Sequence, residues 1–253
     1  MFINLGGLLW LLLLLGPLLI LQRGLHREVQ AIFLILTRRP DITIVMFSLV
    51  FFPGVLLHEC SHFLMARLLG VRTGRFSLLP RPLEDGRLQL GFVETSSADW
   101  LRDALIGAAP LLAGGLFVAY AGLERLGLLT LWQISTAGGL ATLKASLPIL
   151  LNQPDFWLWF YLTLTVSSTM LPSAADRRAW LPLSLTIAVL LGISLLAGAG
   201  NWLLENLALP LSRVFIAIAV VFGISVIVHL VLLPPLWGCR QLLSWLLKIE
   251  IAG

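Results

Sequence analysis

Two histidines and a glutamate have the residue types and the spacing of a zinc site that carries out hydrolysis. His58, Glu59 and His62 form the pattern H-E-x-x-H within the run VLLHECSHFL. On a helix, positions i and i+4 lie on one face, about 40° apart around the axis, so both imidazoles can reach one metal ion. The carboxylate beside the first histidine can then take a proton from an attacking water molecule. The pattern predicts a site with one Zn²⁺ per chain, held by the two histidines, and with Glu59 as general base.

The surrounding sequence predicts the helix that this motif needs and places it in a lipid bilayer. Val55 to Leu69 is an apolar run without a helix breaker. Hydrophobic residues make up 58% of the chain and charged residues only 12%, about half of what is typical of a soluble domain. Several nearly uncharged stretches reach about 18 residues, enough to cross a bilayer. The chain is therefore predicted to be an integral, multi-pass membrane protein, in which buried ionisable residues are functional by default.

The fold class predicted is an all-α polytopic membrane protein, with about six transmembrane helices in a single membrane domain, 1–253. The expected spans are 2–21, 42–69, 101–123, 156–171, 180–199 and 214–233. Between the second and third spans, within 71–99, an Asp85-Gly86 turn and the alternating run from Arg87 to Phe92 predict a small β-hairpin at the membrane surface. The stretch 126–151 is apolar but interrupted, which favours an interfacial or re-entrant helix.

The charge balance limits the classes of partner. The net charge of +4 is accounted for by arginines at span ends, which set topology and meet anionic headgroups. Loop charges favour a cytoplasmic N-terminus. No basic run with interleaved aromatics forms a nucleic-acid groove, so no nucleic-acid partner is expected. The sequence carries no signal for an oligomeric state.

The third zinc ligand is expected to come from another span, at the depth of the histidines. Catalytic zinc usually takes three protein ligands and leaves one position for water. His58 lies about 16 residues, or about 24 Å, into its span. If the span 156–171 runs in the same direction, Asp155 at its start lies on the far side of the membrane, whereas Asp176, just past its end, lies level with the histidines. Asp176 is therefore predicted as the third ligand, the alternative being a solvated charge paired with a neighbouring arginine.

These residues resemble the site-2 protease family of intramembrane zinc metalloproteases. Family members carry H-E-x-x-H on one span and N-x-x-P-x-x-x-D on a later one. Here the second pattern is TMLPSAAD, with Pro172 and Asp176 in register and Thr169 in place of the usual Asn. A looser match to the family's Gly-Pro span lies at 107–115, where close helix packing through small residues is the alternative interpretation. The resemblance covers a catalytic core at about 42–180 and implies that Asp176 is the third ligand.

The resemblance also implies the substrate: a membrane-spanning segment of another protein, expected to have a single span. The compact size suggests a bacterial inner membrane. A helix in lipid buries its peptide bonds in its own hydrogen bonds, so the substrate must unwind before hydrolysis. We expect the predicted strand to add the unwound segment as an extra strand, with contacts from Leu88, Leu90 and Phe92. Thr169 is a further candidate for substrate binding.

Two other functions stay open. A different membrane zinc protease would use a downstream glutamate, Glu124 or Glu205, as third ligand and cut soluble peptides, although neither lies at the depth of His58. A non-catalytic membrane scaffold would keep a metal or peptide groove, and its mark would be a damaged H-E-x-x-H, which is intact here. His229 stands alone in its span and is expected to hydrogen-bond a neighbouring helix.

Overall fold

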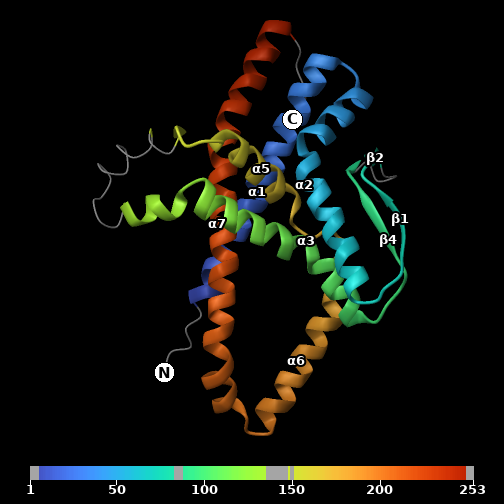
Figure 1. Ribbon diagram of the computed structural model, residues 1–253, viewed down its shortest axis with the longest axis vertical. Helices are drawn as coiled ribbons and strands as arrows, with labels where there is room; N and C mark the ends of the chain where they lie inside the picture. Colours follow the sequence, from blue (N-terminus) through green and yellow to red (C-terminus); the bar gives the residue numbers. More distant parts are fainter. Residues whose placement is uncertain (1–5, 83–87, 135–147, 149–150, 249–253) are drawn as a thin grey trace.

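Helices make up most of the computed structural model, which describes residues 6–82, 88–134, 148 and 151–248 (Figure 1). The helices are α1 (Gly6–Thr37), α2 (Pro40–Leu68), α3 (Trp100–Tyr120), α5 (Phe156–Thr169), α6 (Trp180–Leu196) and α7 (Gly200–Leu247). A π-helical turn, η1 (Ala121–Arg125), continues α3. The predicted all-α class is confirmed.

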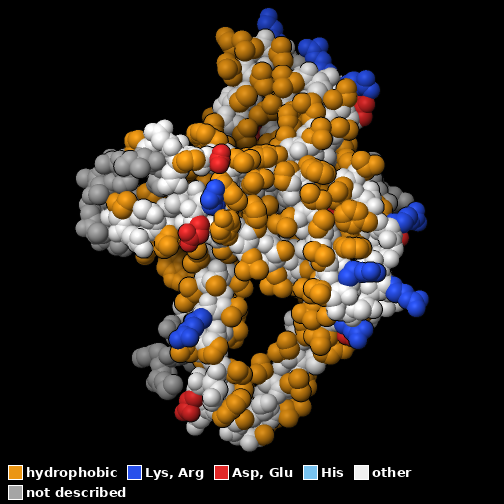
Figure 2. Space-filling view, in the orientation of Figure 1, with side chains coloured by type: hydrophobic (Ala, Val, Ile, Leu, Met, Phe, Trp, Pro, Cys, Tyr) orange, Lys and Arg blue, Asp and Glu red, His pale blue; other side chains and the backbone are white. Residues whose placement is uncertain are grey.

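The chain is a membrane protein by the length and composition of its helices. Four of them are long and apolar enough to cross a bilayer: α1, α2, α3 with η1, and α7. The predicted fourth and fifth spans correspond to shorter helices, α5 with 14 residues and α6 with 17. Hydrophobic side chains dominate the face seen in Figure 2, as a lipid-facing surface requires.

The predicted first and sixth spans are too short. The first span is expected to end at 21, but α1 continues to Thr37. The sixth span is expected at 214–233, but α7 already begins at Gly200 and runs through Pro234 and Pro235 to Leu247. Polar residues in these extensions have partners on distant helices. Gln22 Nε2 donates to the Ser168 carbonyl at 2.6 Å, and Arg240 pairs with Glu28. Because these groups are satisfied inside the protein, they need not end a helix at the membrane surface.

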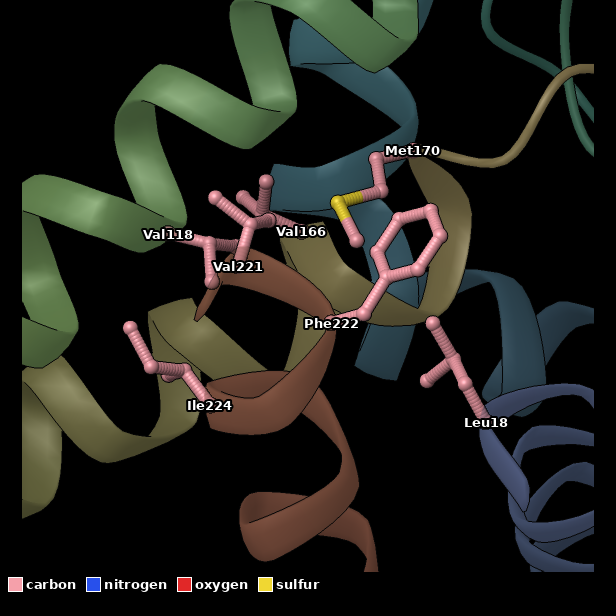
Figure 3. Packing of buried hydrophobic residues seen from close by; sticks show 7 residues of the cluster. All are labelled: Leu18, Val118, Val166, Met170, Val221, Phe222 and Ile224. Carbon is pink, nitrogen blue, oxygen red and sulfur yellow. The ribbon is translucent and has the colours of Figure 1, made fainter. Parts of the chain in front are cut away.

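The terminal helices pack against the helices that carry the predicted motifs. α1 and α7 lie side by side along the long axis of the molecule (Figure 1). Figure 3 shows one buried cluster in which α1, α3, α5 and α7 meet. Its members are Leu18, Val118, Val166, Met170, Val221, Phe222 and Ile224. The helices α1 and α7 therefore pack against α2, α3 and α5, which belong to the predicted core.

The predicted β-hairpin between α2 and α3 is confirmed, but its strands differ in extent. β1 (Thr73–Ser77) pairs antiparallel with β4 (Phe92–Thr95), and β2 (Arg81–Pro82) with β3 (Leu88–Gln89). The expected continuous strand is interrupted at Leu90 and Gly91. A Cβ at Gly91 would lie 2.8 Å from Cγ of Glu59, so the interruption lets the hairpin approach α2 closely. The Asp85-Gly86 turn lies outside the described residues.

Two further stretches complete the fold. Asp99 caps α3 by accepting hydrogen bonds from the Leu101 and Arg102 amides, and the bond from Arg102 holds the pKa of Asp99 below its usual value. Residues 128–134 are helical. Most of the remainder of 126–151 lies outside the described residues, so its interfacial or re-entrant character stays a prediction.

Candidate metal centre

Three side chains predicted as ligands lie together where α2 meets the turn between α5 and α6. The ligating atoms of His58, His62 and Asp176 all lie within 4.8 Å of one another. The two Nε2 atoms are 3.2 Å apart, and Asp176 places its carboxylate oxygens 3.2 Å from His62 Nε2 and 3.8 Å from His58 Nε2. Tetrahedral zinc with bonds of about 2.0–2.1 Å separates its ligands by about 3.3 Å. The donor types and their spacing fit one zinc ion.

Both imidazoles are held by backbone carbonyls. His58 Nδ1 lies 2.7 Å from the Thr169 carbonyl, and His62 Nδ1 lies 2.8 Å from the Ile106 carbonyl. A carbonyl can only accept, so Nδ1 donates in each ring, and in the neutral imidazole Nε2 then holds the lone pair that a metal would use. Both Nε2 atoms face Asp176, as ligands of a metal must.

The carbonyl that orients His58 is available because α5 ends at Thr169. In a continuing helix the amide of Ser173 would donate to the Thr169 carbonyl. Ser173 instead donates to Oδ2 of Asp176 at 2.7 Å. This diversion fixes the third ligand and leaves the Thr169 carbonyl for His58. Residues on either side of Pro172 thus orient two of the candidate ligands.

A cavity of about 830 Å³ adjoins the candidate ligands. Glu59, 7% exposed, lines it together with both histidines, Asp176 and the segment Leu90–Val93. A carboxylate that lines the same cavity as the candidate ligands has the position of a general base. The first strand residues after the interruption therefore share one cavity with the H-E-x-x-H motif.

The predicted substrate-contacting residues fall into two groups. Leu90 and Phe92 line the cavity, whereas the side chain of Leu88 lies outside the described part. Thr169 lines it too, but its hydroxyl donates to the Thr165 carbonyl at 3.0 Å, and its own carbonyl accepts from His58. Because this hydroxyl already donates its proton within α5, the structure adds no support for substrate binding by Thr169. That role stays a prediction.

The glutamates of the alternative zinc site lie elsewhere. Glu124 belongs to η1 and Glu205 to α7, and both are exposed. Within the described residues, neither joins a group of side chains that could hold an ion together with His58. The geometry therefore favours Asp176 over either glutamate.

Gly107 on α3 allows the closest approach at the site. A Cβ there would collide with the backbone carbonyl of Asp176, whereas one at Gly115, two turns along, would meet Val221 at an ordinary 3.9 Å. This close approach agrees with the small-residue interpretation of the span, and the match to the family's Gly-Pro span stays a prediction. Gly107→Ala should displace Asp176 and weaken zinc binding about 10- to 100-fold, measured by competition with a chromophoric chelator. Gly115→Ala is the matched control, and equal zinc affinities in the two variants would contradict the prediction.

Sequence analysis missed His26, which lines the cavity from α1. Its ring lies edge-on to Phe47 and Phe51, with centroids 5.3 and 4.8 Å away. Its Nε2 is buried without a hydrogen-bond partner. His229, in contrast, bonds Ser168 Oγ at 2.9 Å and the Ser225 carbonyl at 2.7 Å, which confirms its predicted structural role. No short motif includes His26, so only its place in the fold reveals it.

Replacing His26 by phenylalanine should stabilise the protein. The unpartnered nitrogen costs about 1–3 kcal/mol, and a phenyl ring would pack against the same two aromatic neighbours. The expected result of His26→Phe is a higher unfolding midpoint in detergent. His229→Phe is the matched control. Its unfolding midpoint should fall, because the change removes two hydrogen bonds. A fall in the midpoint of His26→Phe would show that a partner satisfies the ring.

Comparisons of the chain with models of protein families, with curated proteins and with solved structures found no match. The resemblance to site-2 proteases therefore rests on the motif residues alone.

Proposed function

We propose that this protein is an intramembrane zinc metalloendopeptidase that hydrolyses peptide bonds within or next to transmembrane segments of other membrane proteins. The observation that carries the proposal is the convergence of His58, His62 and Asp176 beside Glu59, at a cavity among apolar helices. Ionisable groups grouped in this way within a membrane protein are costly unless they serve a site. The resemblance to site-2 proteases supports the same function, and a bacterial inner membrane is the proposed location.

The chain's own residues account for metal binding and proton transfer. His58, His62 and Asp176 would hold the ion, with both rings oriented through Nδ1. When bound, zinc supplies a Lewis acid for the scissile carbonyl and for water. Glu59 accepts the proton of the attacking water and passes it to the leaving amine.

The hairpin offers a place for the unwound substrate. β4 pairs with β1 in a two-stranded sheet, which leaves the second edge of residues 93–95 without a strand partner among the described residues. The segment Leu90–Val93 that leads into β4 lines the cavity beside Glu59. A substrate added along this edge would have its backbone near the candidate ligands. We infer that strand addition holds the substrate during cleavage.

Zinc content tests the ligand set. Purified wild-type protein and Glu205→Ala should each hold one zinc per chain by atomic absorption, whereas Asp176→Ala should lose it, because two imidazoles alone bind zinc weakly. The wild type should also cleave a single-span reporter in detergent or liposomes. Loss of zinc in Glu205→Ala with retention in Asp176→Ala would favour the alternative protease. A zinc-loaded wild type that cleaves no single-span protein would favour the scaffold.

A further inference from the structure

The first two turns of α3 make three contacts with the candidate metal centre. The Ile106 carbonyl lies 2.8 Å from His62 Nδ1, and Gly107 lies against the Asp176 backbone. The Ala104 carbonyl accepts from Trp180 Nε1 at 3.4 Å, at the start of α6. Helix α3 thus contributes no candidate metal ligand, but it contacts two of the ligands, His62 and Asp176, and the start of α6.

A carbonyl inside a helix is normally occupied by the amide four residues later. For Ile106 that residue is Pro110, which has no N–H, and Pro110 is fully buried within α3. The Ile106 carbonyl therefore lacks its regular helical partner. The Nδ1–H of His62 supplies the missing hydrogen bond.

The same arrangement recurs at the other histidine. The Thr169 carbonyl also lacks its regular amide, because Ser173 donates to Asp176 instead, and it accepts from His58. Another helix proline gives the contrast. Pro17 in α1 leaves the Leu13 carbonyl without its amide, but within the described residues no side chain donates to it. Ser168, whose regular amide would come from Pro172, has its carbonyl taken by Gln22. Freed carbonyls beside the centre thus accept from side chains of other helices, and two of these side chains are the histidines of the centre.

We propose that Pro110 is a positioning residue of the metal centre. By withholding an N–H, it reserves the Ile106 carbonyl for His62 and so fixes the ring with Nε2 toward Asp176. The proposal rests on the proposed function only in that a metal binds at these residues. The partners that orient metal-bound histidines typically contribute a factor of about 10–100 to metal affinity.

Pro110→Ala tests this by restoring an amide that competes for the Ile106 carbonyl. The dissociation constant for zinc, measured by chelator competition without substrate, should rise about 10- to 100-fold. The absorption bands of the cobalt-substituted protein should shift as the His62 ligand loosens. Pro17→Ala, which restores an amide in a helix away from the centre, should leave both readouts unchanged. Folding should persist, since alanine is the strongest helix former.

A backbone ester separates the amide from the shape of the proline ring. Lactic acid incorporated at position 110 has alanine's side chain but an ester oxygen in place of the N–H. The ester variant should bind zinc as tightly as the wild type. Equal weakening in the ester and alanine variants would overturn the proposal, because the ring and its bend would then be responsible. Unchanged affinity in Pro110→Ala would also overturn it, whereas a wild type that binds zinc but cleaves nothing would overturn only the proposed function.

Discussion

Glu59→Gln should keep zinc bound while peptide hydrolysis falls about 10²- to 10⁴-fold. Glutamine has nearly the same shape as glutamate but cannot accept the proton of the attacking water. The three candidate ligands are other residues, so the metal should remain. The measurement pairs zinc content with the rate of cleavage of a single-span reporter.

Glu124→Gln is the matched control for this variant, because Glu124 is exposed on η1, apart from the candidate ligands. It should cleave at the wild-type rate. Wild-type cleavage by Glu59→Gln would remove Glu59 as general base. If zinc were lost instead, Glu59 would have to be reassigned as a contributor to the metal site.

Breaking the buried ion pair between the terminal helices should produce the largest loss of stability. Arg240 Nε lies 2.5 Å from Glu28 Oε2, with the two side chains 20% and 7% exposed. Arg240→Ala leaves the Glu28 carboxylate buried and unpaired, and such a change costs about 3–5 kcal/mol in the free energy of unfolding. Denaturation in detergent, followed by circular dichroism, measures this loss.

A second change and a second ion pair separate charge from packing. Combining Glu28→Leu with Arg240→Met should recover most of the lost stability, because no buried charge then remains. Arg39→Ala is the control, because Arg39 pairs with Asp41 at the surface, where the two side chains are 64% and 63% exposed. Such exposed pairs contribute at most about 1 kcal/mol. A similar loss in Arg39→Ala and Arg240→Ala would contradict the interpretation.

The candidate site was largely predictable because its residues form local patterns. The H-E-x-x-H spacing needs only one helix, and the depth of Asp176 follows from counting residues along two spans. The turn signal and the alternation before Phe92 likewise indicated the hairpin. The H-E-x-x-H motif and the hairpin depend on neighbours within a few residues, and the prediction of Asp176 needs only the lengths of two spans.

Features that depend on distant partners could not be predicted. Gln22 follows the end of the predicted first span, 2–21, yet its partner at position 168 keeps it inside the protein, and Glu28 likewise pairs with Arg240. His26 belongs to no motif and reaches the cavity only because α1 packs beside α2 and α7. The hydrogen bond between His62 and the Ile106 carbonyl joins two helices whose relative placement the sequence does not encode locally.

The pairing of the first and last helices also bears on biosynthesis. Glu28 and Arg240 are 212 positions apart in the chain. At a translation rate of about 5–20 residues per second, the ribosome needs roughly 10 to 40 s to reach the arginine after it has made the glutamate. During that interval the amino-terminal helix carries a carboxylate that lacks its final counter-ion. A nascent chain released before Arg240 would retain this uncompensated charge and become a substrate for quality-control proteolysis.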